Sequence, residues 1–338
     1  MSKRNTSGFV PNQLLLDIAS LNAGNLSFIE TLAATQRLAA AANAGSVRYK
    51  LAKGASERQI YTAGNATRLP GSKARFETDK AVADNIVNDA FDFHGLMRDF
   101  LKQVFKRDSI DGLGMNLVGT VHYGKSYNNA FWNSMQMTYG DGDKIIFALF
   151  VLLDVIGHEM FHGVTEHTSG LEYSGESGAL NESMSDVFGV GLRQWAKKLT
   201  VDKDSWLVGP GIFMPSIKGK ALRSMTNPGT AYNDPKLGKD PQPDHYSKLY
   251  TGSSDNGGVH INSGIPNKAF ATFAIAVGGN SWDVALPVWF ESNCGTNRID
   301  SSADFATFAA KTVDNCTKMF PQHVAALKAA WNGVGVTV

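Results

Sequence analysis

The sequence has few cysteines and no long apolar segment. Its 338 residues include only Cys294 and Cys316. A fold built on several disulfides is therefore excluded, and we favour two free thiols over a disulfide between them. The longest apolar run covers residues 145–153, which is far short of the about 20 residues that cross a membrane as a helix.

The N-terminus also lacks the pattern of a secretory signal. Residues 1–20 contain basic side chains, but neither a continuous apolar stretch nor a small-residue cleavage site. We therefore expect the protein to stay in the cytoplasm or to leave the cell by a non-classical route.

The charges nearly cancel, with 32 basic and 31 acidic residues and a net charge of +1. This balance provides no general attraction to nucleic acid or to an anionic membrane, so we expect neither as a partner. Hydrophobic residues make up 43% of the chain and charged residues 19%. These fractions are typical of a soluble globular protein, and the length allows two lobes.

Helical and strand-like patterns are separated along the chain. Residues 12–43 and about 79–105 predict helices, whereas residues 46–76 are rich in glycine and short alternations that predict strands and turns. From about residue 147 helical patterns dominate, interrupted by a proline- and glycine-rich stretch at 209–264. Strands first and helices later predict an α+β fold with two segregated lobes.

Three of the eight histidines fall within "HEMFHGVTEH" at residues 158–167. On a helix, His158 and His162 lie about one turn apart and can bind one ion, whereas His167 lies well round the helix and is assigned no role. Glu159 lies beside them, and the three residues form the HExxH pattern. The competing interpretation is a chance match on a polar helix face.

The next segment, "ESGALNESMSD", places Glu182 and Asp186 four residues apart. Catalytic zinc commonly takes two imidazoles and one carboxylate, so Glu182 is the candidate third ligand. Asp186 would accept the second N–H of a liganded histidine. A solvated acidic helix face is the alternative, but small and apolar residues surround these carboxylates, and a buried carboxylate needs a partner.

The whole stretch from Gly157 to Gly189 resembles the zinc-site signature of the thermolysin family of metalloendopeptidases. The similarity continues in "VHYGKSYNNAFW" from Val121 and "DHYSKLYTGSSDNGGVHINSG" from Asp244, and it covers nearly everything after residue 46. The short segment before it resembles the compact propeptide of the protealysin-like branch. The resemblance implies a two-lobed zinc endopeptidase with its active site in the cleft between the lobes.

The resemblance also implies roles for individual residues. Zinc would be bound, one ion per chain, by His158, His162 and Glu182. Glu159 would be the general base and proton shuttle, and Tyr173 and His260 would lie where negative charge develops on the carbonyl oxygen. Three further residues would support these groups: Asp186 behind His158, Asn181 behind His162 through its backbone, and Asp255 behind His260.

Substrate contacts follow from the same resemblance. Residues of "NAFW" and one arginine would bind the substrate, the arginine bracing the carbonyl that follows the cut; they are Asn129, Ala130, Phe131, Trp132 and Arg223. An aliphatic pocket for the residue after the cut would be lined by Ile146, Leu149, Val155, Val208, Ile212 and Leu222. Cleavage is therefore expected on the N-terminal side of large hydrophobic residues.

The sequence departs from the family at its calcium sites. Asp154 matches a calcium aspartate, but Arg193 stands where a partnering glutamate is expected, and Lys220 replaces another aspartate. Because calcium needs several oxygen ligands, we expect none at the usual sites. Instead we predict a direct ion pair between Asp154 and Arg193, with Lys220 supplying a second positive charge.

We divide the chain into a helical, inhibitory propeptide at 1–46, a β-rich lobe with the zinc helix at 47–168 and a mainly helical lobe at 169–338. The propeptide would cover the cleft, because its helices have no large core of their own. We expect a monomer that acts on peptides and proteins. One alternative is a protein that binds zinc and peptides without turnover, and another is an interaction protein whose leader docks onto partners.

Overall fold

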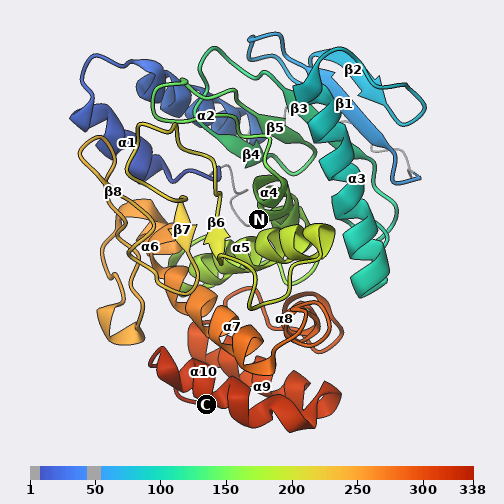
Figure 1. Ribbon diagram of the computed structural model, residues 1–338, viewed down its shortest axis with the longest axis vertical. Helices are drawn as coiled ribbons and strands as arrows, with labels where there is room; N and C mark the ends of the chain where they lie inside the picture. The colour runs from blue at the N-terminus through green and yellow to red at the C-terminus, as the bar shows by residue number, and fades with distance from the viewer. Residues whose placement is uncertain (1–7, 44–54) are drawn as a thin grey trace.

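The computed structural model describes residues 8–43 and 55–338 (Figure 1). Its helices are α1 (Asn12–Leu21), α2 (Ser27–Asn43), α3 (Asn85–Phe105), α4 (Leu153–Glu166), α5 (Gly175–Lys197), α6 (Ser254–Asn262), α7 (Gly264–Val277), α8 (Ala285–Cys294), α9 (Phe305–Met319) and α10 (Val324–Gly333), with single 3₁₀ turns at Tyr246–Lys248 and Pro321–His323. Its strands are β1 (Arg58–Thr62), β2 (Ser72–Phe76), β3 (Leu117–Val121), β4 (Ala130–Trp132), β5 (Met137–Tyr139), β6 (Leu207–Val208), β7 (Arg223–Ser224), β8 (Asn233–Asp234) and β9 (Gly238–Lys239).

The N-terminal lobe is built on a five-stranded sheet with the order β2-β1-β3-β5-β4. β1, β3 and β5 run parallel, and the two outer strands are antiparallel to their neighbours. α3 packs against β1 and β3. β4 is left at one edge of the sheet, where its backbone is available to another segment.

The helices α4 and α5 cross the middle of the molecule, between this sheet and the bundle of α7 to α10 (Figure 1). They pack closely because glycines face each other. A Cβ on Gly157 would lie 2.9 Å from the Gly189 Cα, and one on Gly189 would lie 2.5 Å from the Asp154 carbonyl oxygen. The lack of side chains at these two positions permits the close helix approach.

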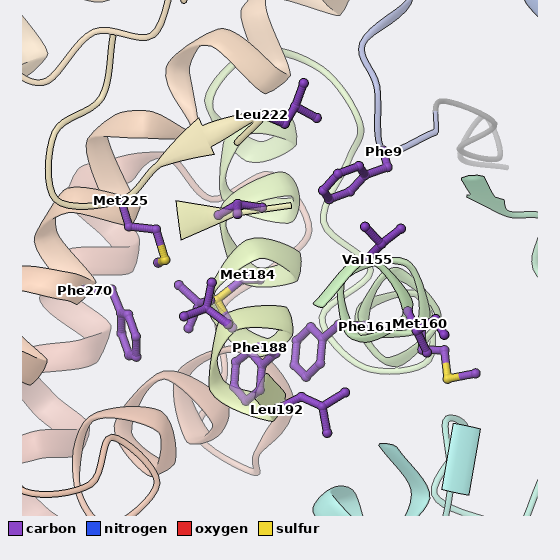
Figure 2. Close-up of a cluster of buried hydrophobic side chains, with 14 of the residues drawn as sticks. Phe9, Val155, Met160, Phe161, Met184, Phe188, Leu192, Leu222, Met225 and Phe270 are labelled. Carbon is purple, nitrogen blue, oxygen red and sulfur yellow. The ribbon is translucent and has the colours of Figure 1, made fainter. Parts of the chain in front are cut away.

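Aromatic stacking joins α4 to α5 and joins helices of the C-terminal bundle to one another. Phe161 of α4 and Phe188 of α5 stack with ring centroids 3.8 Å apart, and Figure 2 shows them side by side in the core. Deeper in the bundle, Trp289 of α8 stacks on Trp331 of α10 at 5.9 Å. Such large buried rings contribute a major share of the apolar burial that stabilises a lobe.

The leader, residues 8–43, runs along one side of both lobes and ends in α2 against the loop before β4 (Figure 1). Thr35 and Tyr127 share a hydrogen bond of 2.8 Å between their hydroxyls. The Asn128 backbone N–H donates to the Thr31 hydroxyl at 3.0 Å, and Asn25 donates to Asp143 at 2.8 Å. These polar contacts fix α2 on the N-terminal lobe.

The predicted two-lobed α+β architecture is confirmed. The expected division at residue 168 falls in the connection between α4 and α5, whereas the expected end of the leader at residue 46 lies outside the described residues. α3 begins at Asn85 rather than near 79, because the Asp84 carboxylate accepts the Ile86 N–H at 2.9 Å and caps the helix there.

Cys294 and Cys316 are free thiols, as we favoured. In the part of the chain that the structure describes, no helix combines the length and apolar character needed to cross a membrane.

Candidate metal and catalytic site

Two imidazoles and one carboxylate converge between α4 and α5. His158 and His162 are one turn apart on α4, and their Nε2 atoms lie 3.1 Å from each other. Each Nε2 also lies 3.4 Å from an oxygen of Glu182 on α5. One ligand atom from each residue can be chosen so that all lie within 4.8 Å of one another, and all three side chains are buried.

Acceptors behind the histidines set their tautomers. His158 Nδ1 lies 2.8 Å from Asp186 Oδ1, and His162 Nδ1 lies 2.8 Å from Asn181 Oδ1. Asn181 also donates from Nδ2 to the Leu171 carbonyl at 3.1 Å, which orients its oxygen toward His162. Each Nδ1 therefore carries the proton and each Nε2 keeps a lone pair for a metal. The expected support of His162 by the Asn181 backbone is wrong, since the side chain provides it.

Asp186 is itself held by several donors. Its oxygens accept two hydrogen bonds of 2.8 Å from Arg223 and one of 2.8 Å from Asn267. Burial alone would raise the pKa of this carboxyl, but Arg223 and His158 outweigh burial and lower the pKa to about 2. The residue behind His158 is thus a fixed negative charge.

Two buried carboxylate oxygens in the site have no hydrogen-bond partner among the described residues, Glu159 Oε1 and Glu182 Oε2. A buried anionic oxygen is costly unless a cation or a donor faces it. Two imidazole lone pairs and a carboxylate form the donor set that zinc prefers. The residues present therefore fit a zinc ion.

Glu159 is buried on the same turn of α4 as the two histidines. Its Oε2 accepts the Trp132 backbone N–H of β4 at 2.9 Å, which ties the helix to the edge strand. Burial raises the pKa of this carboxyl to about 8, and the neighbouring His158 partly opposes the rise. A proton-accepting group with a pKa near neutrality suits general base catalysis.

Tyr173 and His260 lie on the other side of the ligand cluster. The Tyr173 hydroxyl donates to Glu182 and lies 3.3 Å from His260 Nε2. The Asp255 carboxylate accepts two hydrogen bonds from His260, one from Nδ1–H at 2.7 Å and one from the backbone N–H at 2.8 Å. Burial opposes a charged imidazole here, but Glu182 and Asp255 outweigh it and raise the pKa of His260.

The turn that places Asp255 is unusual. Four consecutive residues, 255–258, have positive φ values, from 52° to 83°. Two of them are glycines, which adopt this left-handed conformation without strain. This turn directs the Asp255 carboxylate back onto His260.

Two models of one protein family match this sequence, one for each lobe. Residues 30–166 match the profile described as "Thermolysin metallopeptidase, catalytic domain", and residues 169–336 match "Thermolysin metallopeptidase, alpha-helical domain". This chain belongs to the thermolysin metallopeptidase family. It is therefore a metallopeptidase that acts on peptide bonds.

Relatives within the family match over most of their length. The extracellular metalloprotease of Pectobacterium carotovorum subsp. carotovorum is 45% identical over 86% of this chain and 84% of its own. Protease PrtS of Photorhabdus sp. strain Az29 is 46% identical over 83% and 76%. The solved precursor of protealysin, a metalloproteinase from Serratia proteamaculans, is 44% identical, with a TM-score of 0.87 over 98% of this chain and 99% of its own.

The leader passes through the cleft beside this family site. Phe9 is fully buried, and its ring meets the His158 ring edge-on with centroids 5.0 Å apart. Figure 2 shows the Phe9 ring beside Val155 of α4, with Leu222 above it. A Cβ placed on Gly209 would be 3.0 Å from the Phe9 ring, so the ring reaches the backbone on that side.

The pocket residues that the resemblance implied are only partly brought together. Five of the implied pocket residues are buried in the large apolar core that also contains Phe9: Ile146, Val155, Val208, Ile212 and Leu222. Leu149 is half-buried and is not part of that cluster. Phe131 points to the other face of β4, where it packs with Tyr123 and Tyr127 under Ala34 of α2. Ala130 and Trp132, on either side of it, face the main core, as strand alternation requires.

Near the candidate metal ligands, α4 and α5 are also joined by the predicted ion pair. Arg193 Nη1 lies 2.5 Å from Asp154 Oδ2, and both side chains are buried, so this prediction is confirmed. Arg193 also pairs with Asp204 at 3.1 Å and donates to the Leu207 carbonyl at 2.7 Å. Asp204 was missed, although it and Asp202 are the only carboxylates between residues 187 and 233.

Lys220 has a different environment. Its side chain is exposed, and within residues 8–43 and 55–338 it forms no ion pair. Its suggested role as a local substitute for calcium therefore has no carboxylate to act on.

Proposed function

We propose that this protein is a zinc endopeptidase that cleaves before large hydrophobic residues and is made as a latent precursor. The observation that carries the proposal is Phe9, buried in an apolar pocket against a metal-ligand histidine. A leader that fills the substrate pocket explains both the preference for a large apolar side chain and the latency. Burying such a side chain contributes about 1.5–3 kcal/mol, enough to dominate the choice among peptides.

His158, His162 and Glu182 would hold one zinc ion per chain. Zinc at this position would polarise the scissile carbonyl and lower the pKa of the attacking water to about 7. Glu159 is placed to accept the proton of that water, because its Oε1 faces the site while Trp132 holds Oε2. It then passes the proton to the leaving nitrogen.

Tyr173 and His260 would donate hydrogen bonds to the carbonyl oxygen as its negative charge develops. Asp255 keeps Nδ1 of His260 protonated and favours a second proton on the ring, which gives Nε2 a hydrogen to donate. Removing one such donor in other enzymes costs about 3–4 kcal/mol of transition-state stabilisation.

The substrate backbone would be held as the leader is held. Asn129 accepts the Val10 N–H at 2.8 Å and donates to the Val10 carbonyl at 2.9 Å. Ala130 accepts the Phe9 N–H at 3.0 Å, and Arg223 donates to the Phe9 carbonyl at 3.3 Å. Residues 1–46 would thus act as an inhibitory propeptide, and peptides and proteins would compete for the cleft after its removal.

Replacing Glu159 by Gln separates proton handling from metal binding. The variant should keep its zinc, because Glu159 is not a ligand, yet lose nearly all peptidase activity on a peptide library. Metal analysis and library digestion of both proteins, each with the leader removed, measure this. Substantial turnover by Glu159→Gln would refute the role, and intact zinc without turnover in the wild type would favour a peptide-binding protein instead.

A further inference from the structure

The leader presents a particular peptide bond to the catalytic groups. Arg223, expected to brace the carbonyl that follows a cut, donates to the carbonyl of Phe9 at 3.3 Å. The Phe9 side chain is buried beside Val155 and Leu222, which the resemblance assigns to the pocket for the residue after the cut. Its N–H is bound by the Ala130 carbonyl at 3.0 Å. Gly8–Phe9 is therefore the bond that occupies the place of the scissile bond, and a latent precursor needs a reason for leaving it intact.

Gly8 passes the edge strand along a path that other residues cannot follow. It is buried, and a Cβ built on it would fall far inside contact distance of the Ala130 carbonyl oxygen. The same Cβ would lie 2.8 Å from Asn129 Cγ. Cβ atoms essentially never approach other atoms closer than 3.0 Å, and the Ala130 oxygen is backbone, so it cannot rotate away.

Substrates with a side chain before the cut must therefore take a different path at this point. Their backbone has to rotate or move outward from Ala130, which changes the orientation of the carbonyl group relative to Glu159 and His260. Reaction rates are sensitive to such changes, since a misplacement of about 1 Å can cost on the order of 100-fold.

We propose that Gly8 protects the leader from self-cleavage by allowing a close, unreactive path past Ala130. This inference rests on the proposed function, because it assumes an active peptidase inhibited by its leader. The protected reaction is hydrolysis of Gly8–Phe9. Water would add its hydroxyl to the carbonyl carbon of residue 8 and a proton to the Phe9 nitrogen. The C–N bond breaks, and the products are a carboxylate and an ammonium group, because the acid proton passes to the amine.

The rest of the leader would hold residue 8 in the cleft even when its fit changes. α2 stays attached through Thr35 to Tyr127, Thr31 to Asn128 and Asn25 to Asp143. A side chain at position 8 therefore moves the local backbone outward without releasing the leader. That movement brings the bond onto the path of ordinary substrates.

The test is Gly8→Ala in the full chain with zinc, compared with wild type and with Gly24→Ala. Gly24 is a matched control in the same leader, because a Cβ there would meet no atom of residues 8–43 and 55–338 within 4 Å. Intact mass and N-terminal sequencing over time should reveal a new N-terminus at Phe9 in Gly8→Ala, formed on the order of 100-fold faster than in wild type. Gly24→Ala should behave as wild type, and adding Glu159→Gln to Gly8→Ala should abolish the cut.

Three results would overturn the proposal. They are an uncut Gly8→Ala that is as latent as wild type, a wild type cut before Phe9 as fast as the variant, and a Gly8→Ala that loses latency without this cut. Gly8→Ser adds the same Cβ and provides the answer if the alanine variant does not fold. A wild-type precursor that is as active as the processed enzyme would instead refute the proposed latency, whatever happens at Phe9.

Discussion

Two buried acidic sites lie between α4 and α5, and they are neutralised in different ways. At Asp154, Arg193 supplies the cation from within the chain, and the Gly209 N–H adds a bond of 2.9 Å to the same oxygen. At Glu182, the Nε2 atoms of His158 and His162 lie 3.4 Å from the carboxylate oxygens, and Oε2 lacks a hydrogen-bond partner among the described residues. The first site is complete as protein, whereas the second needs an ion, so only the second can perform metal chemistry.

The largest expected effect breaks the second site. His162→Ala removes one of the ligand atoms between α4 and α5, so zinc content should fall from one ion per chain toward zero and peptidase activity to background. Metal analysis and a peptide assay measure the two quantities. Equal zinc in variant and wild type would contradict the ligand assignment.

Breaking the first site should affect stability rather than chemistry. Arg193→Ala leaves Asp154 and Asp204 buried without their cation, which should lower the free energy of unfolding by roughly 3–5 kcal/mol. Lys220→Ala is the matched control, and it should change stability little because Lys220 is exposed. Urea unfolding of wild type and the two variants, with zinc present, measures these free energies. Equal losses of unfolding free energy in Arg193→Ala and Lys220→Ala would contradict the stabilising role of the Asp154–Arg193 pair.

Calcium sharpens the same contrast. Because Arg193 occupies the neighbourhood where the family binds a cation, a chelator selective for calcium over zinc should leave the melting temperature nearly unchanged. Removing zinc with a stronger chelator should lower it. A drop of many degrees with the calcium-selective chelator would show that calcium sites persist elsewhere in the chain.

The smallest effect concerns a third charged cluster, which is pH-sensitive. Two carboxylates, Asp141 and Asp84, bind opposite nitrogens of His122 at 2.9 Å each. The Asp141 hydrogen bond is the main cause that raises the pKa of His122 to about 9. Since the folded pKa exceeds the unfolded value of about 6.5, this contribution is complete below pH 6.5 and disappears as the pH rises through 9.

The difference in unfolding free energy between wild type and His122→Asn should therefore shrink from pH 6 to pH 10. It should stay below about 1 kcal/mol, because solvent screens a partly exposed pair. Urea titrations across that range measure it. A difference that grows with pH would have the wrong sign for a protonated histidine.

Helical spacing and residue chemistry made part of the site predictable. His158, His162 and Glu159 follow from one helix turn, and Glu182 follows from its apolar surroundings, because local geometry fixes which side chains share a face. The Asp154–Arg193 pair was predicted from the family resemblance, which places Arg193 where a calcium-binding partner of Asp154 is expected, and from the need of a buried carboxylate for a positive charge. Tyr173 and His260 came from the family resemblance alone.

Contacts between distant loops were not predictable from local patterns. Asp204 reaches Arg193 from an irregular segment, and Phe9 reaches the pocket from before the first helix, so neither has a periodic signal. The support of His162 was assigned to the Asn181 backbone from the resemblance, because the sequence does not show the hydrogen bond to the Leu171 carbonyl that orients the Asn181 side chain. Phe131 points to the face of β4 opposite to that of Ala130 and Trp132. This direction could not be predicted, because a strand of three residues is too short to be recognised in the sequence.

Asp186 connects two binding events that are otherwise separate. One of its oxygens holds His158, and the guanidinium that it binds holds the Phe9 carbonyl. Whatever favours one contact positions the other, and thermodynamic linkage requires the effect to be mutual. A peptide in the cleft and the ion between the helices should therefore be cooperative ligands, so that the precursor retains its metal more tightly than the processed enzyme does.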